Sequence, residues 1–463
     1  MRGCHFFFIS GPRSHDRIEY RFTMISTIRL MLSLLAVALS PVLPGAWAEP
    51  DGADPVNDRH FFFDLETPGG PLPFEVEGLV GWQQFTGFTI INGEEEVSIR
   101  RTEHTVENRR FTVVSELGGF DSKFTLKGVM FEPTETWFGA WSIRRRSGIT
   151  HVPFKVHERN HRFELPDTPP TITSGRYRVT FASSPDDPAV GLFTINDDGT
   201  ATGTFLTTTG DYRYLAGNAA GDTLKLSTFD GAHAFLFHAE KQAHGSLTGD
   251  FWSGNWYHDT WTAEPDPDFR LPDPFAQTTY RGDAASLERL SFTDLEGIPT
   301  PVGALAPHGS PRIVEVFGSW CPNCHDATRL LSELHANYKD RGLVVLGLAF
   351  EHSEDETKAI EAVRTYKDDL QVEYPLLIAG LSDKKRASEM LPVLDRVRSF
   401  PTTLFIDADG DIRAVHSGFS GPATGDAHTE LRERFTAHIE AMLEERESQA
   451  ANQADMPAAV PSD

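Results

Sequence analysis

Two cysteines, Cys321 and Cys324, form a C-x-x-C pair. The pair follows an apolar run, Ile313 to Phe317, and precedes a segment with helical periodicity, so it is expected where a strand passes into a helix. At the first turn of a helix, unpaired backbone N–H groups and the positive end of the helix dipole favour the thiolate form of Cys321. Cys324 follows one turn later and can attack a mixed disulfide formed at Cys321. The spacing therefore predicts thiol–disulfide exchange, with Cys321 as nucleophile and Cys324 as resolving thiol.

The composition excludes several classes of protein. The chain has 463 residues, a formal charge of -25, 39% hydrophobic residues and three cysteines. Its length predicts two or three domains. Three cysteines are too few for a disulfide-stapled fold or a four-thiolate zinc module. The acidity argues against nucleic acid as a partner, because phosphate binding needs clustered lysines and arginines.

The amino-terminal segment has the pattern of a secretory signal over residues 1–48. From Met24 the chain shows Arg29, an apolar run from Leu30 to Leu39, and the small-x-small cleavage pattern Ala46-Trp47-Ala48. Residues 1–23 are interpreted as an over-called start. The apolar run is short for a membrane anchor, which is the alternative interpretation, and no cysteine follows it to carry a lipid. We expect an exported, periplasmic protein that is soluble after cleavage and keeps only the C-x-x-C thiols.

Residues 49–263 carry strand signals. Short stretches of alternating apolar and polar residues are separated by turn sequences such as Asn92-Gly93 and Asn196 to Gly199. The pattern predicts an all-β region, an antiparallel sandwich or barrel. A weak boundary at residues 166–170 leaves open whether there are two β units or one continuous unit. Residues 264–279 are rich in proline and acidic residues and are interpreted as a linker.

Residues 280–445 alternate between strand and helix patterns, which predicts an α/β domain around a central sheet. Strands are expected at 313–317, 343–350, 376–379, 403–406 and 412–416, and helices at 327–338, 360–370 and 428–444. Residues 446–463 are polar and without pattern, and a disordered tail is expected there. The sequence thus predicts a multidomain chain, with an α/β domain behind an all-β region.

Two motifs in residues 280–445 resemble a known family. Residues 318–324, GSWCPNC, follow the apolar strand, and residues 399–407, SFPTTLFID, come about 80 residues later. Together they resemble the thioredoxin superfamily, and specifically its exported TlpA/ResA-like branch. The run HSGFSGPATG at residues 416–425 is similar to a subset of these proteins.

The resemblance implies a thioredoxin fold in which Pro401 is cis and faces the cysteine pair. It also implies that the backbone at Phe400 pairs with an extended substrate segment, with Thr402 in the same substrate-binding loop. Trp320 is expected to shield the pair and pack against a partner, or else to serve only in packing.

Glu315 lies six residues before Cys321, where the resemblance places a buried carboxylate behind the resolving cysteine. Desolvation would raise its pKa and suit it to move a proton to or from Cys324. The alternative is that strand alternation points Glu315 to solvent at a sheet edge. The branch often has a glutamate three residues after the second cysteine, but Ala327 occupies that position here. Acid-assisted proton transfer would therefore depend on Glu315.

The predicted function is reduction of protein disulfides by the dithiol, without a cofactor. Because oxidised partners dominate outside the cytoplasm, we expect a reductant recharged by a membrane electron donor of the thiol-reducing type. A protein that instead oxidises the thiols of its clients would have a strongly oxidising reduction potential.

Four alternatives remain beside this prediction. The β region could bind a ligand and use the redox domain as an accessory, with the aromatic cluster at residues 252–261 lining a cavity or simply forming core. Cys321, Cys324 and His325 could instead carry copper, although the predicted cis-proline would hinder access and no other metal site is expected. A structural disulfide closing four residues would constrain little. A thiol peroxidase would need Thr or Ser where Gly318 stands.

Overall fold

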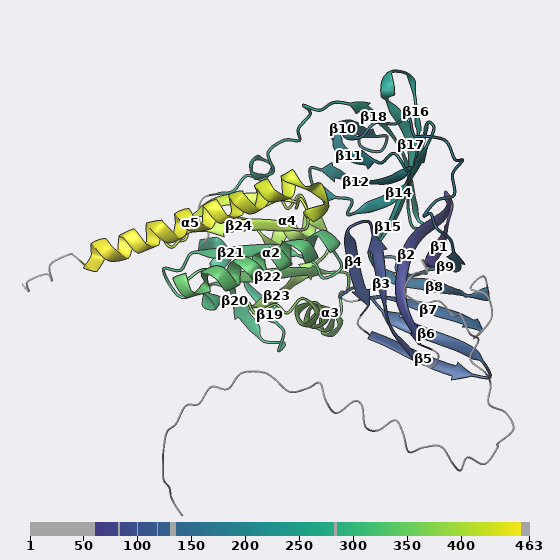
Figure 1. The fold of residues 1–463 in the computed structure, drawn as a ribbon. Helices are drawn as coiled ribbons and strands as arrows, with labels where there is room; N and C mark the ends of the chain where they lie inside the picture. Colours follow the sequence, from purple (N-terminus) through teal and green to yellow (C-terminus); the bar gives the residue numbers. More distant parts are fainter. Residues whose placement is uncertain are drawn as a thin grey trace, which may run out of the picture. The chain divides into compact units, whose positions relative to one another are not determined.

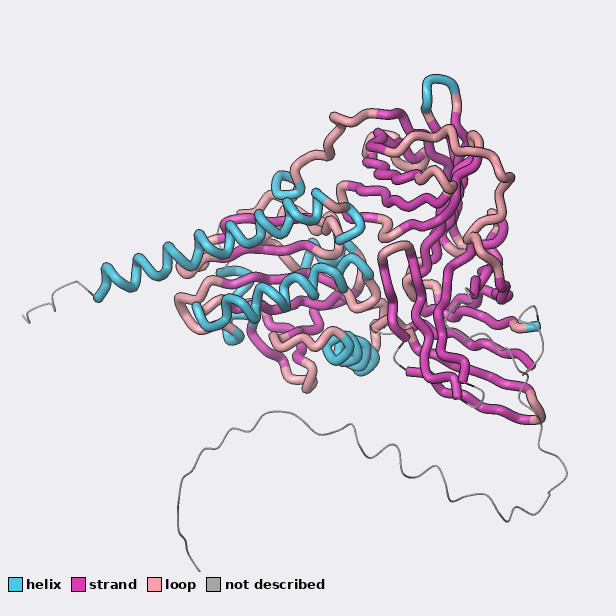
Figure 2. The backbone as a smooth tube through the Cα atoms, viewed as in Figure 1, coloured by secondary structure: helices cyan, strands magenta, loops and turns pink. Residues whose placement is uncertain are grey.

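The computed structural model describes residues 61–81, 84–99, 101–117, 119–129, 136–281 and 285–454. The predicted signal segment, residues 1–48, lies outside these ranges. The described chain forms two nine-stranded antiparallel sheets followed by a seven-stranded mixed sheet with helices (Figure 1). The tube view shows the same division, with strands filling the first part of the chain and helices confined mainly to the second (Figure 2). The predicted fold class, an all-β region before a thioredoxin-like domain, is confirmed.

The first sheet contains nine strands in the order β4-β3-β2-β1-β9-β8-β7-β6-β5. Their bounds are β1 Phe61–Thr67, β2 Gly70–Gly81, β3 Gln84–Asn92, β4 Glu95–Ile99, β5 Arg101–Glu107, β6 Arg110–Glu116, β7 Ser122–Val129, β8 Phe138–Arg145 and β9 Gly148–Glu158. Alternation decides which face is buried: in β9, Val152, Phe154 and Val156 are buried, whereas Pro153 and Lys155 between them are exposed.

The second sheet closes on itself as a barrel. Its strands pair in antiparallel fashion in the order β11-β10-β18-β17-β16-β15-β14-β12-β13, and an additional pairing of β11 with β12 closes the sheet. The bounds are β10 Gly175–Phe181, β11 Ala189–Ile195, β12 Thr200–Thr207, β13 Gly210–Asp211, β14 Leu215–Ala220, β15 Thr223–Phe229, β16 Ala234–Lys241, β17 Leu247–Ser253 and β18 Tyr257–Pro265. Aromatic rings pack inside, including Phe205 against Phe237 at 4.4 Å between ring centroids.

The two β sheets share a hydrophobic core. Phe229 at the end of β15 stacks on Phe74 of β2 at 4.5 Å and meets Trp141 of β8 edge-on at 4.9 Å. Arg162, in the connection from Glu158 to Gly175, donates both to the Pro73 carbonyl of the first sheet and to the Ser227 carbonyl of the barrel, each at 3.3 Å. The weak sequence boundary at residues 166–170 falls inside this connection. The sheets are therefore separate in strand pairing but joined by packing and by side-chain hydrogen bonds.

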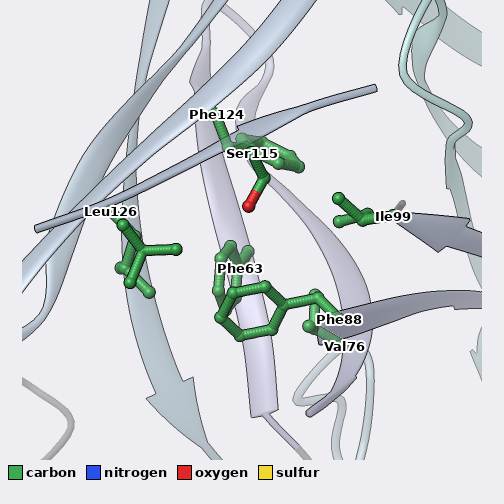
Figure 3. A pocket seen from close by; sticks show the side chains of 8 residues that line it. Phe63, Val76, Phe88, Ile99, Ser115, Phe124 and Leu126 are labelled. Carbon is green, nitrogen blue, oxygen red and sulfur yellow. The ribbon is translucent and has the colours of Figure 1, made fainter. Parts of the chain in front are cut away.

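A small cavity lies within the first sheet (Figure 3). It measures about 10 Å³, roughly the space of one water molecule. Its walls are apolar except for Ser115. The aromatics at residues 252–261 lie elsewhere and apart: Trp261 is in the barrel core, Trp252 and Trp256 pack on the core of the first sheet, and Tyr257 is exposed. They are divided among these sites and line no common cavity within the described residues.

The carboxyl-terminal domain is built on a seven-stranded sheet in the order β20-β19-β23-β22-β21-β24-β25. Its strands are β19 Ser291–Asp294, β20 Pro299–Pro301, β21 Arg312–Phe317, β22 Val344–Glu351, β23 Leu376–Leu381, β24 Thr402–Ile406 and β25 Ile412–Ser417. Its helices are α1 Ala285–Glu288, α2 Pro322–Tyr338, α3 Glu356–Asp369, α4 Lys384–Met390 and α5 Asp426–Ala454. All strands and helices predicted for this domain are present. The central strand β21 is buried along its whole length, between parallel β22 and antiparallel β24.

The last helix differs from the prediction. We expected it to end near Glu444 and a disordered tail to begin at residue 446, but α5 continues to Ala454. Contacts with the domain hold this extension: Arg446 donates to the Arg341 carbonyl at 2.7 Å, and Gln449 donates to Asp409 at 2.9 Å. Residues 446–454 show no apolar periodicity in the sequence, because the side chains that anchor them are polar.

Candidate active site

The C-x-x-C motif lies where the central strand passes into α2. β21 ends at Phe317, residues 318–320 turn, and Cys321 caps the helix that begins at Pro322. Pro322 fits this position because its missing N–H would have had no partner in the helix. The Cys321 Sγ accepts the backbone N–H of Cys324 at 3.3 Å. This hydrogen bond and the helix dipole both stabilise negative charge on Cys321.

The nucleophile faces the loop that precedes β24. The Phe400–Pro401 peptide is cis, and the Cys321 thiol donates to the Phe400 carbonyl at 3.4 Å. Cys321 is only 6% exposed. Both cysteines are free thiols in this structure. The Cys321 sulfur is therefore enclosed between the first turn of α2 and the Phe400–Pro401 loop.

The other predicted substrate-binding residues lie in two environments. Trp320 meets the Phe400 ring edge-on at 5.7 Å and stacks on His352 at 4.6 Å. Its indole N–H donates to the Phe350 carbonyl at 2.8 Å, which holds the ring beside Cys321. Thr402, in contrast, is fully buried and donates to the Ser399 carbonyl at 2.8 Å. The structure thus places Trp320, Phe400 and Pro401 around the thiol and turns the Thr402 side chain inward.

The resolving cysteine lies in the protein interior next to a buried acid. Cys324 and Glu315 are both 0% exposed. Burial raises the pKa of the Cys324 thiol well above its usual range, and the neighbouring Cys321 and Glu315 add to the rise. Burial also raises the pKa of Glu315 to about 8, although hydrogen bonds from Thr328 and Tyr374 oppose the rise. The dry environment and the neighbouring acid therefore keep the Cys324 thiol protonated.

Glu315 has an environment suited to holding a proton. Thr328 of α2 donates to its Oε2 at 2.9 Å and Tyr374 donates to the same oxygen at 3.4 Å. Its Oε1 is buried and has no hydrogen-bond partner among the described residues. Tyr366 links this group to the resolving cysteine, because its hydroxyl donates to the Cys324 carbonyl or to Thr328. A carboxyl without a neighbouring cation favours the neutral form, which explains the direction of its pKa.

A second buried acid, Glu351, was not predicted from the sequence. It is the last residue of β22 and accepts the Ser319 backbone N–H at 2.8 Å and the Ser319 hydroxyl at 2.7 Å. Burial raises the pKa of Glu351 to about 7 despite these two hydrogen bonds. The carboxyl holds the turn that carries Trp320 and Cys321. The signal available in the sequence was an acid that directly follows an apolar run, whereas Glu315 lies inside its strand.

His325, which we considered as a copper ligand, is engaged in packing. Its Nε2 contacts the Ser319 carbonyl at 2.8 Å, and its ring lies between Phe120 at 4.3 Å and Tyr366 at 4.7 Å. Burial lowers the pKa of His325 to about 3, so the ring is neutral and donates to the carbonyl. Within the described ranges, no three His, Cys, Asp or Glu side chains are arranged to hold a metal ion.

The fold and the site define the class of protein. A dithiol at the start of the helix after a central strand, facing a cis-prolyl loop and lying over a buried acid, is a thioredoxin-like thiol–disulfide site. Residues 285–415 match the AhpC/TSA family. The carboxyl-terminal domain is therefore an AhpC/TSA thioredoxin-like domain, preceded by an all-β region.

Curated relatives align with the carboxyl-terminal part of the chain. The thioredoxin-like protein YneN of Bacillus subtilis is 28% identical over 110 residues, which are 24% of this chain and 58% of the relative. The thiol-disulfide oxidoreductase ResA of Bacillus cereus is 25% identical over 144 residues, 29% of this chain and 75% of the relative. The domain is thus homologous to thiol–disulfide oxidoreductases.

Among solved structures, a secreted disulfide oxidoreductase of Mycobacterium tuberculosis, described as homologous to E. coli DsbE, is 18% identical. The match covers 34% of this chain and 99% of that one, with a TM-score of 0.26. In the part of the chain that the structure describes, no helix has the length and apolar character that crossing a membrane requires.

Proposed function

We propose that the protein is an exported thiol–disulfide oxidoreductase that reduces disulfides in protein clients. In the first step the Cys321 thiolate attacks one sulfur of the client disulfide, and the other sulfur leaves as a thiolate that takes a proton from solvent. In the second step Cys324 gives its proton to Glu315 and attacks the Cys321 sulfur. The second client sulfur leaves Cys321 as a thiolate and takes a proton from solvent. The client thus leaves with two thiols, and Cys321 and Cys324 become a disulfide. Two electrons pass from the dithiol to the client.

The burial of Cys324 over Glu315 is the observation that carries this proposal. A fully buried thiol is a poor nucleophile unless a nearby group can accept its proton. Glu315, with a pKa near 8, can accept that proton at neutral pH once it is ionised. A dithiol used only as a structural crosslink would need no such group. The arrangement therefore supports exchange chemistry at this pair.

Export and the reducing direction rest on the sequence. The predicted signal segment supports export, and the two remaining thiols support a simple redox cycle without shuffling to a third cysteine. Such a reductant needs a source of electrons outside the cytoplasm, so we propose a membrane donor of the thiol-reducing type as a second partner.

The experiment is trapping in the native periplasm. Cys324→Ser should accumulate mixed disulfides at Cys321, and Cys321→Ser should abolish both trapping and exchange. Identification of the trapped proteins would name the clients. Equal residual exchange by the two variants would contradict the assigned roles. A measured reduction potential near about -120 mV would contradict the reducing direction.

A further inference from the structure

The β region packs against the first turn of the redox helix. Phe120, in the loop between β6 and β7, stacks on the ring of His325 at 4.3 Å. Asn323 donates to the backbone carbonyl of Asp211 in the barrel at 3.4 Å. Asp326 forms a buried ion pair with Arg213, two residues after that carbonyl. The residues on either side of Cys324 therefore all contact the β region.

Two glycines of the β region allow this close approach. Gly119 has φ 73°, and a Cβ there would lie 2.6 Å from Cε1 of His325. Gly210 has φ 151°, and a Cβ there would lie 2.0 Å from Nδ2 of Asn323. Glycine adopts these φ values without strain, and a Cβ at either position would also press against the facing side chain. The contact with α2 therefore depends on the backbone conformation of the two loops that carry Gly119 and Gly210.

Arg213 joins three parts of the molecule. Its guanidinium pairs with Glu95 of β4 in the first sheet, with Asp230 of the barrel at 3.5 Å, and with Asp326 of α2. Arg213 is 7% exposed, and all three carboxylates are largely buried. Buried charges of this kind persist only when each has its partner in place. Arg213 therefore couples the docking of the redox domain to the integrity of both β sheets.

The contact continues to the loop beside the cis-proline. Gly421 donates its backbone N–H to the Asp211 carboxylate. Gly418 approaches Thr209 of the barrel so closely that a Cβ would lie 2.9 Å from its carbonyl carbon. The N–H of Gly418 in turn donates to the Pro401 carbonyl at 2.9 Å. The β region thus covers both structures that flank the nucleophile, the first turn of α2 and the loop bonded to Pro401.

We propose that the β region is a gate that determines which disulfides reach Cys321. Small disulfides react while the β region is docked, whereas a folded protein disulfide reacts only after the contact centred on Arg213 has opened. This inference rests on the proposed function, and it adds a specificity-determining role for the β region. Cys321 is nearly buried in the docked state. Opening should therefore increase the reaction rate of Cys321 with a bulky reagent far more than its rate with a small one.

The test compares small and large thiol reagents on the full chain. Cys4→Ser and Cys324→Ser leave Cys321 as the sole cysteine. The probes are N-ethylmaleimide and a maleimide carrying a polyethylene glycol chain of about 5 kDa. In this parent we expect the large reagent to react at least tenfold more slowly than the small one, after correction for their rates with a free thiol.

Two variants open the contact from opposite sides. Arg213→Met and Asp326→Asn should each raise labelling by the large reagent about tenfold and change labelling by the small one less than twofold. Matched controls are Arg159→Met and Asp64→Asn, which break a partly buried ion pair inside the first sheet. The controls should behave as the parent. If Arg213→Met does not fold, Asp326→Asn still decides the question, because it leaves Arg213 with Glu95 and Asp230.

The outcomes separate the gate from the proposed function. The gate would be overturned if both reagents label the parent at equal corrected rates. It would also be overturned if Asp326→Asn changes the two labelling rates by the same factor. A second arm uses chains with both active-site cysteines, with insulin as protein disulfide and oxidised glutathione as small disulfide. The same variants should accelerate insulin reduction several-fold and leave glutathione reduction unchanged. No reduction of either substrate by any chain would defeat the proposed function while leaving the labelling result intact.

Discussion

The redox domain and the β region bury carboxyl groups in opposite ways. In the redox domain, Glu315 is fully buried, receives two hydrogen bonds and has no cation beside it among the described residues. In the β region, Glu95, Asp211 and Asp230 surround Arg213 together with Asp326 from the redox domain. Burial alone would lower the pKa of Arg213, but these four carboxylates outweigh burial and hold it well above its usual value.

The difference separates two uses of buried charge. Without a cation nearby, Glu315 has a pKa of about 8 and ionises close to neutral pH. The proposed mechanism needs the ionised form to accept the Cys324 proton. Carboxylates around a guanidinium remain ionised in part and hold elements together by ion pairing. One arginine cannot neutralise four carboxylates, which is consistent with the raised pKa values of Glu95 and Asp211, where burial is the largest cause. We therefore propose proton transfer at the first site and, at the second, a contact that opens.

The largest effect is expected from removing the cation at the second site. Arg213→Met removes the buried guanidinium that Glu95, Asp230 and Asp326 share. Among the described residues, the basic partners that remain are His233 for Asp230 and Arg329 for Asp326. The change should destabilise the protein by about 3–5 kcal/mol. Urea unfolding followed by tryptophan fluorescence would measure the loss. Arg144→Met, which breaks an exposed pair with Asp121, serves as control and should cost less than about 1 kcal/mol. A loss at Arg213 no larger than that of the control would show that the contact is not maintained by charge.

The next effect concerns proton transfer at the first site. Glu315→Gln removes the acceptor for the Cys324 proton, so the resolving step should slow by about 10²-fold, while the first attack by Cys321 changes little. Acid-quenched alkylation would show the mixed disulfide accumulating. The difference from the parent should grow as the pH rises towards 8, where Glu315 ionises. An unchanged pH profile would leave Glu315 with a structural role only.

The pH dependence of stability gives a third comparison. In the folded state Glu315 has a pKa of about 8, compared with 4.5 for an ordinary glutamate. Between these pH values the folded protein holds a proton on Glu315 that the unfolded chain has lost. The contribution of Glu315 to stability is therefore complete below about pH 4.5 and declines as the pH rises to 8. Glu351, with a pKa of about 7, acts in the same direction.

We expect Glu315 alone to lower the stability of the reduced protein by about 2 kcal/mol between pH 6 and pH 8, and Glu351 to add a smaller loss. Glu315→Gln should be less sensitive to pH over this interval. Thermal unfolding at the two pH values would measure the change, and Glu373→Gln, at an exposed ion pair with Lys339, is a control that keeps the dependence of the parent. If the stability of the parent rises between pH 6 and pH 8, Glu315 is not a buried acid that holds its proton at pH 6.

The smallest effect is expected at Glu351. Gln can still accept the Ser319 backbone N–H, but its amide nitrogen cannot accept the Ser319 hydroxyl, so one hydrogen bond must rearrange. Glu351→Gln should slow attack by Cys321 less than tenfold and weaken its pH dependence around pH 7. Ser319→Ala is the matched variant, since it removes the same hydroxyl contact from the other side. A loss of activity as large as that of Cys321→Ser would show that Glu351 does more than position the turn.

Local patterns predicted much of the redox domain. The apolar run at 313–317 and the helical spacing after it placed Cys321 at the strand-to-helix junction, where the structure has it. Glu351 was missed because the expected strand ended at Phe350, and a single acid at its end does not reveal whether the sheet buries it. The end of α5 was also misplaced, since polar anchors leave no periodic signal.

The sequence by itself determined the chemistry of the pair, the alternation that builds the β sheets, and the order of the domains, because these depend on residues close together in the chain. Only the tertiary structure decided that Glu315 is dry and that Arg213 meets Glu95 and Asp326. Arg213 lies more than a hundred residues from either partner, and no local pattern specifies which distant carboxylates will share one buried cation. Burial and ion pairing are properties of the assembled core, and they determine where this protein holds a proton and where its parts are joined.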